Sequence, residues 1–231
     1  MAEAASYVRG LVSETAEGRA APRHSALVRV THWIFALSFF GLVVSGVGII
    51  LAHPHFYWGE TGNIETTPLF SLPLPTMLGG PSGWGRYLHF QSAWIAVLTG
   101  ALYFVSGVLT GHFRKELVPA AAELKWSSLR ASVADHLQAG RLAEERSYNV
   151  LQRLSYLGVI FVLFPMTILT GLAMSPVITS VAPLTVTMFG GHQSARTLHF
   201  FLSDLLVLFL MVHVGMVVAA GFGRRMRGMI R

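Results

Sequence analysis

Four apolar stretches, each long enough to cross a lipid bilayer, constrain this chain more than any other feature of its sequence. A helix needs about 20 apolar residues to span the hydrocarbon core. Of the 231 residues, 53% are hydrophobic and 12% are charged, which is about half the charge of an average soluble domain. The sequence therefore predicts an all-α membrane protein, a four-transmembrane-helix bundle with a kink at Pro165. Its spans are expected at about 27–51, 88–109, 150–173 and 198–222.

Lysine and arginine are distributed unevenly between the connections, and this predicts the orientation of the bundle. Nearly all of them lie in the N-terminal arm, in the connection between the second and third spans, and in the C-terminal tail. By the positive-inside rule, both termini and the middle connection are then cytoplasmic. We expect a flexible cytoplasmic arm over 1–23, a helical domain over 24–223 and a basic cytoplasmic tail over 224–231.

The charge and the cysteine content limit the partners and cofactors. The net charge of +6 lies in the arm, the middle connection and the tail, so it indicates orientation in membrane lipid and not a nucleic-acid partner. The chain contains no cysteine, which excludes disulfides, thiolate iron–sulfur ligation and covalent haem attachment through a C-x-x-C-H motif. Any cofactor must be held by histidine, methionine, carboxylates or packing.

Four histidines in the apolar stretches form two levels across the predicted membrane. An ionisable residue inside a span is costly and is a functional candidate by default. His89 and His199 lie at the outer level, and His32 and His213 lie at the inner level; we call these the outer pair and the inner pair. His199 and His213 are fourteen residues apart, which places them on one helix face with about 21 Å between them.

Two opposed imidazoles on facing helices of a bundle are the ligands that a six-coordinate haem iron needs. The chain has no cysteine or carboxylate-rich cluster to form a zinc or di-iron site. A single membrane histidine is more often an interhelical hydrogen-bonding group than a ligand, and this alternative stays open for each histidine taken alone. The paired depths favour two non-covalent b-type haems, with iron ligands His32, His89, His199 and His213.

A repeated pattern supports this assignment. The segments RVTH, RYLH and RTLH each place an arginine one turn before a histidine at the entrance of a span. An arginine at this spacing shares the histidine's helix face, so its guanidinium can reach a haem propionate at the interface. The predicted propionate partners are Arg29, Arg86 and Arg196. Gly46, fourteen residues after His32, leaves room for a macrocycle at the outer level.

Three motifs together resemble the bacterial di-haem cytochrome b membrane subunits. These are RVTHW at 29–33, the spacing of the two histidines in the fourth span, and YNVLQRLSYLG at 148–158. That superfamily includes cytochrome b561, formate dehydrogenase gamma subunits and nickel-hydrogenase cytochromes b, and the third motif is most similar to the thiosulfate reductase cytochrome b branch. The resemblance covers about 24–222 and implies a multi-pass protein of the bacterial inner membrane.

The resemblance also implies a function in the respiratory chain. Members pass electrons between the quinone pool and a partner oxidoreductase, which in the most similar branch is commonly a periplasmic molybdopterin enzyme. The matching quinone site lies at the inner start of the third span, where Tyr148, Asn149 and Gln152 are the candidates. N-capping of the third helix by Asn149 is the alternative for these residues. The chain is then an electron-transfer subunit, and we assign it no catalytic residue.

Two rival functions remain open at this point. One is a self-sufficient quinone-linked oxidoreductase, such as a superoxide oxidase. Arg86 and Arg196 on an otherwise acid-poor outer face would suit a small anionic substrate. The other is a haem-free membrane anchor or transporter.

Overall fold

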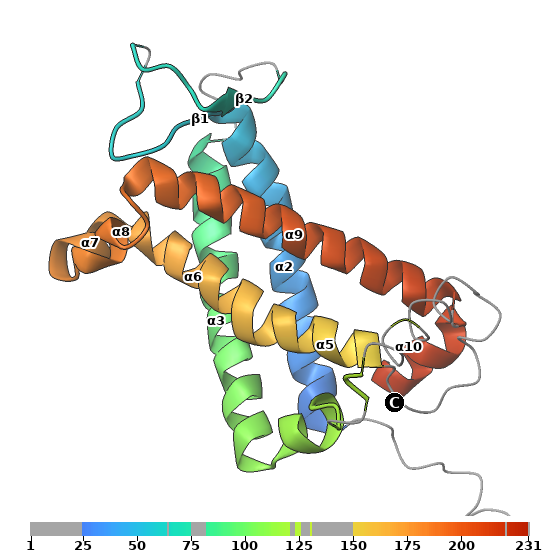
Figure 1. Cartoon of the computed structure of the whole chain (residues 1–231). Coiled ribbons are helices and arrows are strands. Elements are labelled where there is room, and N and C mark those ends of the chain that lie inside the picture. The colour runs from blue at the N-terminus through green and yellow to red at the C-terminus, as the bar shows by residue number, and fades with distance from the viewer. Residues whose placement is uncertain are drawn as a thin grey trace, which may run out of the picture.

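The computed structural model shows a helical protein with one small hairpin at one end (Figure 1). It describes residues 25–63, 65–74, 82–120, 123–125, 130, 150–219 and 221–230. The predicted arm over 1–23 lies outside the described residues. The elements are α2 (Ala26–Ala52), β1 (His55–Phe56), β2 (Phe70–Ser71), α3 (Ser82–Leu109), η1 (Phe113–Leu117), α5 (Val150–Gly158), η2 (Val159–Leu163), α6 (Phe164–Ala173), α7 (Pro176–Val181), α8 (Leu184–Thr187), α9 (His192–Ala219) and α10 (Phe222–Ile230).

The four predicted spans are confirmed as helical segments long and apolar enough to cross a membrane. They are α2, α3, the continuous run of α5, η2 and α6, and α9. Two of them begin earlier than predicted, because α3 begins at Ser82 and α9 at His192. The first six residues of each helix, at 82–87 and 192–197, are more polar than the residues that follow. A prediction from hydropathy alone therefore places the beginning of these two helices too late. The chain is an all-α membrane protein.

The four spans form two helix pairs. α2 lies beside α3, and α6 lies beside α9, with the second pair crossing the first (Figure 1). Small residues allow the close approach within the first pair, since a Cβ at Gly41 of α2 would overlap Ser92 Oγ of α3. Ser38 and Ser45 of α2 are also buried there, and each donates its hydroxyl proton to a carbonyl of its own helix.

The third span contains a π-helical turn immediately before its proline. η2 covers Val159–Leu163, and Pro165 is the second residue of α6. Proline has no N–H, and its ring clashes with the carbonyl four residues earlier in a regular α-helix. A wider π-helical turn relieves this conflict, so the irregularity predicted at Pro165 is located in the turn before it.

The segment over 53–63, which we call the outer loop, is held at the start of α9 by hydrogen bonds. The Gly59 carbonyl accepts hydrogen bonds from the backbone N–H groups of Gln193 (3.0 Å) and Ser194 (3.2 Å). Ser194 Oγ in turn accepts from the Gly59 N–H at 2.7 Å. These bonds satisfy N–H groups that a helix start leaves without helical partners. Gly191, with φ of +114°, permits this approach, because a Cβ there would lie 2.5 Å from the Gly59 carbonyl carbon.

The fourth span ends earlier than predicted and is followed by a separate helix. α9 ends at Ala219, and α10 begins at Phe222 after Gly221, whose φ is +93°. Most of the segment predicted as a basic tail is therefore helical. The indole N–H of Trp33 donates to the Met229 carbonyl at 3.0 Å, which ties α10 to the start of α2.

An aromatic cluster closes the bundle at the end of α3. The chain turns back after α3, and buried Phe113 of η1 packs against Phe104 and Phe161, with ring centroids 5.8 and 5.3 Å away. Gly107 of α3 makes room for this ring, since a Cβ there would lie 2.5 Å from Phe113 Cζ. Close packing in this cluster joins η1 to both α3 and η2.

We predict that Gly107→Ala destabilises the protein, because the new methyl group must displace the Phe113 ring. Overpacking of this kind costs about 1–3 kcal/mol. Gly100→Ala is the matched control in the same helix, since its Cβ would meet only Phe35, at 3.9 Å. Thermal unfolding in detergent measures both variants. Equal midpoints for the two variants would contradict this account of the cluster.

Candidate functional site

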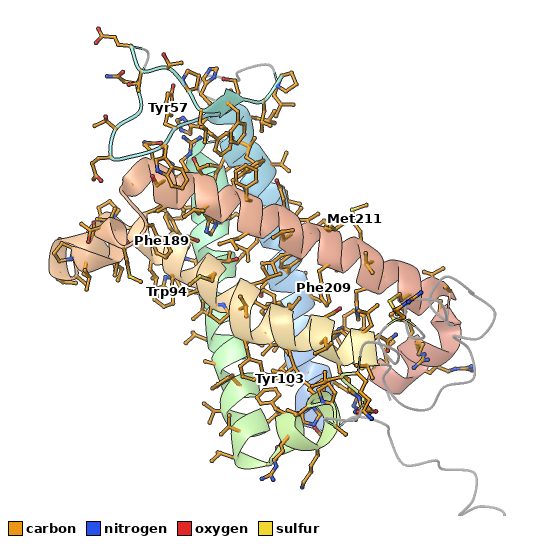
Figure 2. The ribbon with its side chains drawn as sticks, in the orientation of Figure 1. Tyr57, Trp94, Tyr103, Phe189, Phe209 and Met211 are labelled. Atoms are coloured by element: carbon orange, nitrogen blue, oxygen red, sulfur yellow. The ribbon has the colours of Figure 1, made fainter. Side chains whose placement is uncertain are left out.

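The inner pair brings together α2 and α9. The ring centroids of His32 and His213 are 6.5 Å apart, with an angle of 50° between the planes. Aromatic side chains lie beside His213. Phe209 stacks on His213 at 5.9 Å, and Tyr156 of α5 lies 6.4 Å from the same ring. In Figure 2, Phe209 lies on the side of α9 that faces α5.

The outer pair brings together α3 and α9. The ring centroids of His89 and His199 are 6.3 Å apart, and their planes are inclined at 65°. Both side chains are partly buried in the bundle. The two pairs therefore have nearly the same separation between rings. α9 contributes one histidine to each of them.

Neighbouring helices hold both histidines of the outer pair. His89 Nδ1 lies 3.0 Å from Ser45 Oγ of α2. His199 Nδ1 lies 3.0 Å from Thr170 Oγ1 of α6 and 3.0 Å from the Thr167 carbonyl. A carbonyl can only accept, so Nδ1 of His199 carries the proton and Nε2 keeps its lone pair.

The distances in both pairs fit two imidazoles bound to one metal ion. With metal–nitrogen bonds of about 2 Å, rings on opposite sides of an ion have centroids about 6 Å apart. Within the described part of the chain, no three His, Cys, Asp or Glu side chains gather into a metal-binding group. The available donor sets are thus pairs of imidazoles, which suit an iron whose other ligands come from a macrocycle.

Two glycines border the outer pair. A Cβ at Gly46 would lie 4.0 Å from His89 Cε1, so this glycine is at the level that its spacing from His32 predicts. A Cβ at Gly171 of α6 would lie 3.4 Å from His199 Cε1. A larger side chain at either position would occupy space beside an imidazole.

Arg29 supplies a buried cation near the inner pair. Its Nη1 atom is buried and has no hydrogen-bond partner among the described residues. Arg29 lies one turn before His32 in α2, so both side chains leave the same helix face. A buried guanidinium nitrogen without a partner is costly, and an anionic group such as a haem propionate would satisfy it.

The other two arginines lie at the outer end, and one of them has a role that the sequence did not predict. Arg196 donates to the carbonyls of His53 and His55 and lies 4.9 Å over the Phe56 ring. Arg86 is exposed. Partial burial lowers the pKa of His53, and the positive charges of Arg196 and Arg86 lower it further. Both arginines are therefore close enough to interact electrostatically with His53.

The predicted quinone residues are only partly described. Tyr148 and Asn149 lie outside the described residues, whereas Gln152 is half-buried in the first turn of α5. Its neighbour Arg153 forms an ion pair with Glu123, in which Nη1 and Oε2 are 3.5 Å apart. This ion pair joins the start of α5 to the connection that follows η1.

Sequence reasoning missed Ser45 and Thr170. Both side chains are fully buried, with 0% exposure, and both contact outer-pair histidines. The available signal was a hydroxyl residue followed by glycine in the first and third spans, at 45–46 and 170–171. Such dipeptides are common in membrane helices, so the signal gains meaning only when the helices are seen together.

Comparison with known proteins identifies the family. A model of the prokaryotic cytochrome b561 family matches residues 23–231. A protein of Azospira oryzae named as a protein-methionine-sulfoxide reductase subunit, YedZ1, is 33% identical over 198 residues, which are 84% of this chain and 89% of that protein. No solved structure matches the chain. The chain therefore belongs to the prokaryotic cytochrome b561 family, and it is a multi-pass electron-transfer protein of the bacterial inner membrane that binds b-type haem.

Proposed function

We propose that the chain binds two b-type haems, one at each histidine pair, and carries electrons between the quinone pool and a partner oxidoreductase. The observation that carries this proposal is the presence of two imidazole pairs with ring centroids 6.5 and 6.3 Å apart. Two imidazoles would hold each haem, and the haem would supply a one-electron carrier. The four iron ligands are His32, His89, His199 and His213.

The residues around each pair orient and neutralise the bound group. Arg29 holds the propionates at the inner pair, because its buried Nη1 lacks a partner among the described residues. Arg86 holds a propionate at the outer end, where it is exposed near the start of α3. Arg196 keeps its bonds to the outer loop, and its remaining N–H groups stay available for a propionate.

The depth of the two pairs supports electron transfer across the membrane. His199 and His213 lie on one continuous helix, fourteen residues apart, which corresponds to a rise of about 21 Å. This is most of the thickness of the hydrocarbon core. With the charge-based orientation, the outer pair faces the periplasm and the inner pair the cytoplasm.

We further propose a quinone site beside the inner pair, at the start of α5. Gln152 is half-buried there, and Tyr148 and Asn149 directly precede this helix in the sequence. A phenol and two amides provide both donors and acceptors for quinone oxygens. The ion pair between Arg153 and Glu123 stabilises the start of α5, which contains Gln152.

The partner that we propose is a catalytic oxidoreductase on the periplasmic side, a molybdopterin enzyme. The supporting observation is the relative from Azospira oryzae, which is named as a subunit of a protein-methionine-sulfoxide reductase. The placement of this chain near the thiosulfate reductase branch stays a prediction. A subunit that only transfers electrons needs no catalytic residue of its own.

One rival function has an observation in its favour. Arg86 and Arg196 concentrate positive charge near His53 at the outer end, and this would attract a small anion such as superoxide. Rapid reduction of the purified chain by superoxide, with quinone present and no partner, would favour a self-sufficient oxidoreductase. Membership of a haem-binding family speaks against a haem-free anchor or transporter.

We predict two haems per purified chain and the loss of one or both in His89→Ala, because one haem would lose a histidine that holds it. His192→Ala is the control, since this histidine also lies on α9 but outside both pairs. Haem extraction and quantification on protein of known concentration measure the ratio. A wild-type ratio of one, or an unchanged ratio in His89→Ala, would contradict the assignment.

Arg29→Met should weaken haem binding at the inner pair, because the buried guanidinium no longer pairs with a propionate. Charge-assisted hydrogen bonds contribute about 1.5–3 kcal/mol, so the affinity should fall about 10- to 100-fold. Competition with a haem-binding apoprotein measures this loss. Arg114→Met is the control at an exposed arginine. An unchanged haem affinity in Arg29→Met would show that Arg29 does not bind a propionate.

Gln152→Leu should raise the KM for quinol with no change in haem content, because one hydrogen bond to the quinone is lost. A neutral hydrogen bond of about 1 kcal/mol corresponds to about a fivefold change in KM. Reduction of the haems by a soluble quinol analogue gives the rate. Ser155→Ala controls for polarity on the same helix, since Ser155 donates to the Leu151 carbonyl. If both variants keep the wild-type KM, Gln152 does not contact quinone.

A further inference from the structure

We propose that Ser45 and Thr170 are positioning residues for the outer haem, which fix the orientation of His89 and His199 and lower the reduction potential of that haem. This inference rests on the proposed haem at the outer pair. Its starting point is a repeated arrangement in the two helix pairs. In each pair, a hydroxyl residue on one helix holds the histidine that the adjacent helix contributes.

The direction of each hydrogen bond follows from the hydroxyl's other partners. Ser45 Oγ donates to the Gly41 carbonyl at 2.7 Å. Thr170 Oγ1 donates to the Met166 carbonyl at 2.9 Å. A hydroxyl has a single proton, so each oxygen that donates within its own helix must accept from the imidazole. The Nδ1 atoms of both outer histidines therefore carry protons.

A second acceptor reinforces this arrangement at His199. It is the Thr167 carbonyl, three residues before Thr170 on α6, which lies 3.0 Å from Nδ1. With Nδ1 protonated, Nε2 is the nitrogen with a lone pair for iron.

The residue after each hydroxyl is a glycine that borders the same ring. A Cβ at Gly171 would lie 3.4 Å from His199 Cε1, and one at Gly46 would lie 4.0 Å from His89 Cε1. The hydroxyl therefore binds Nδ1 of the imidazole, and the glycine leaves room beside the neighbouring Cε1 atom. Ser45 and Thr170 are both fully buried, at 0% exposure, so water does not compete for these bonds.

The consequence for the haem is electronic as well as geometric. An imidazole that donates its second N–H to an acceptor is a more basic ligand. A more basic ligand stabilises ferric iron over ferrous iron, which lowers the reduction potential. Ser45 and Thr170 contact the histidines of the outer pair, and His213 of the inner pair lies about 21 Å from His199 along α9. We therefore expect changes at Ser45 and Thr170 to act on the outer haem alone.

The test is a spectroscopic redox titration of the purified, haem-loaded chain and of Ser45→Ala and Thr170→Val. His89→Ala identifies which of the two potentials belongs to the outer haem. In each hydroxyl variant, the equilibrium constant for one-electron reduction of the outer haem should rise about tenfold, which corresponds to about 59 mV. The inner haem should keep its potential. Thr170→Ser, which retains the hydroxyl, should restore the wild-type value.

Two matched controls separate positioning from general packing. Thr167→Val removes a hydroxyl that donates to the Leu163 carbonyl, but it leaves the Thr167 backbone acceptor in place. Ser38→Ala removes a buried hydroxyl of α2 that donates to the Ile34 carbonyl. Both controls should keep the wild-type potentials. Loss of the outer haem in Thr170→Val supports the proposal if Thr170→Ser and Thr167→Val both retain that haem.

The possible outcomes distinguish this inference from the proposed function. Two bound haems whose potentials are the same in wild type, Ser45→Ala and Thr170→Val would overturn the positioning role and leave the di-haem proposal intact. Equal shifts in the hydroxyl variants and in the two controls would also overturn it. A wild-type chain without a haem at the outer pair would overturn the proposed function first.

Discussion

A histidine inside a membrane helix needs partners for its ring nitrogens, because the hydrocarbon core offers no water to satisfy them. In the outer pair, the adjacent helix satisfies Nδ1 of each ring through Ser45 and Thr170. Nε2 is left with its lone pair, and the two rings stand at a separation that suits one shared metal ion. The proposed function of the chain depends on these two roles: Nδ1 binds the adjacent helix, and Nε2 stays available to bind iron.

The architecture serves this arrangement by keeping α9 in place at both ends. α9 carries one histidine of each pair, so a shift of this helix would alter both sites. At its start, the outer loop binds it through Gly59, and Thr197 Oγ1 donates at 2.7 Å to the carbonyl of Tyr57, which is labelled in Figure 2. Towards its other end, Tyr156 of α5 contacts Phe209 and His213.

Much of the framework could be predicted from the sequence, because spans and depths depend on the count of residues along a helix. Fourteen residues between His199 and His213 give their separation, and the same count from His32 puts Gly46 at the outer level. Contacts between helices depend on rotation and packing, which a single sequence does not encode in a readable pattern. For this reason the contacts of Ser45 and Thr170 with the histidines were not predicted, and neither was the binding of Arg196 to the outer loop. The end of α9 at Ala219 was also missed, because the apolar sequence continues beyond it.

The central claim is that two haems lie between two pairs of histidines. The most direct measurement is the low-temperature electron paramagnetic resonance spectrum of the oxidised, purified protein. Two low-spin ferric signals of equal intensity are expected, each from a haem with two imidazole ligands. A single low-spin signal, or a high-spin ferric signal from an iron with an open position, would contradict the two-haem assignment.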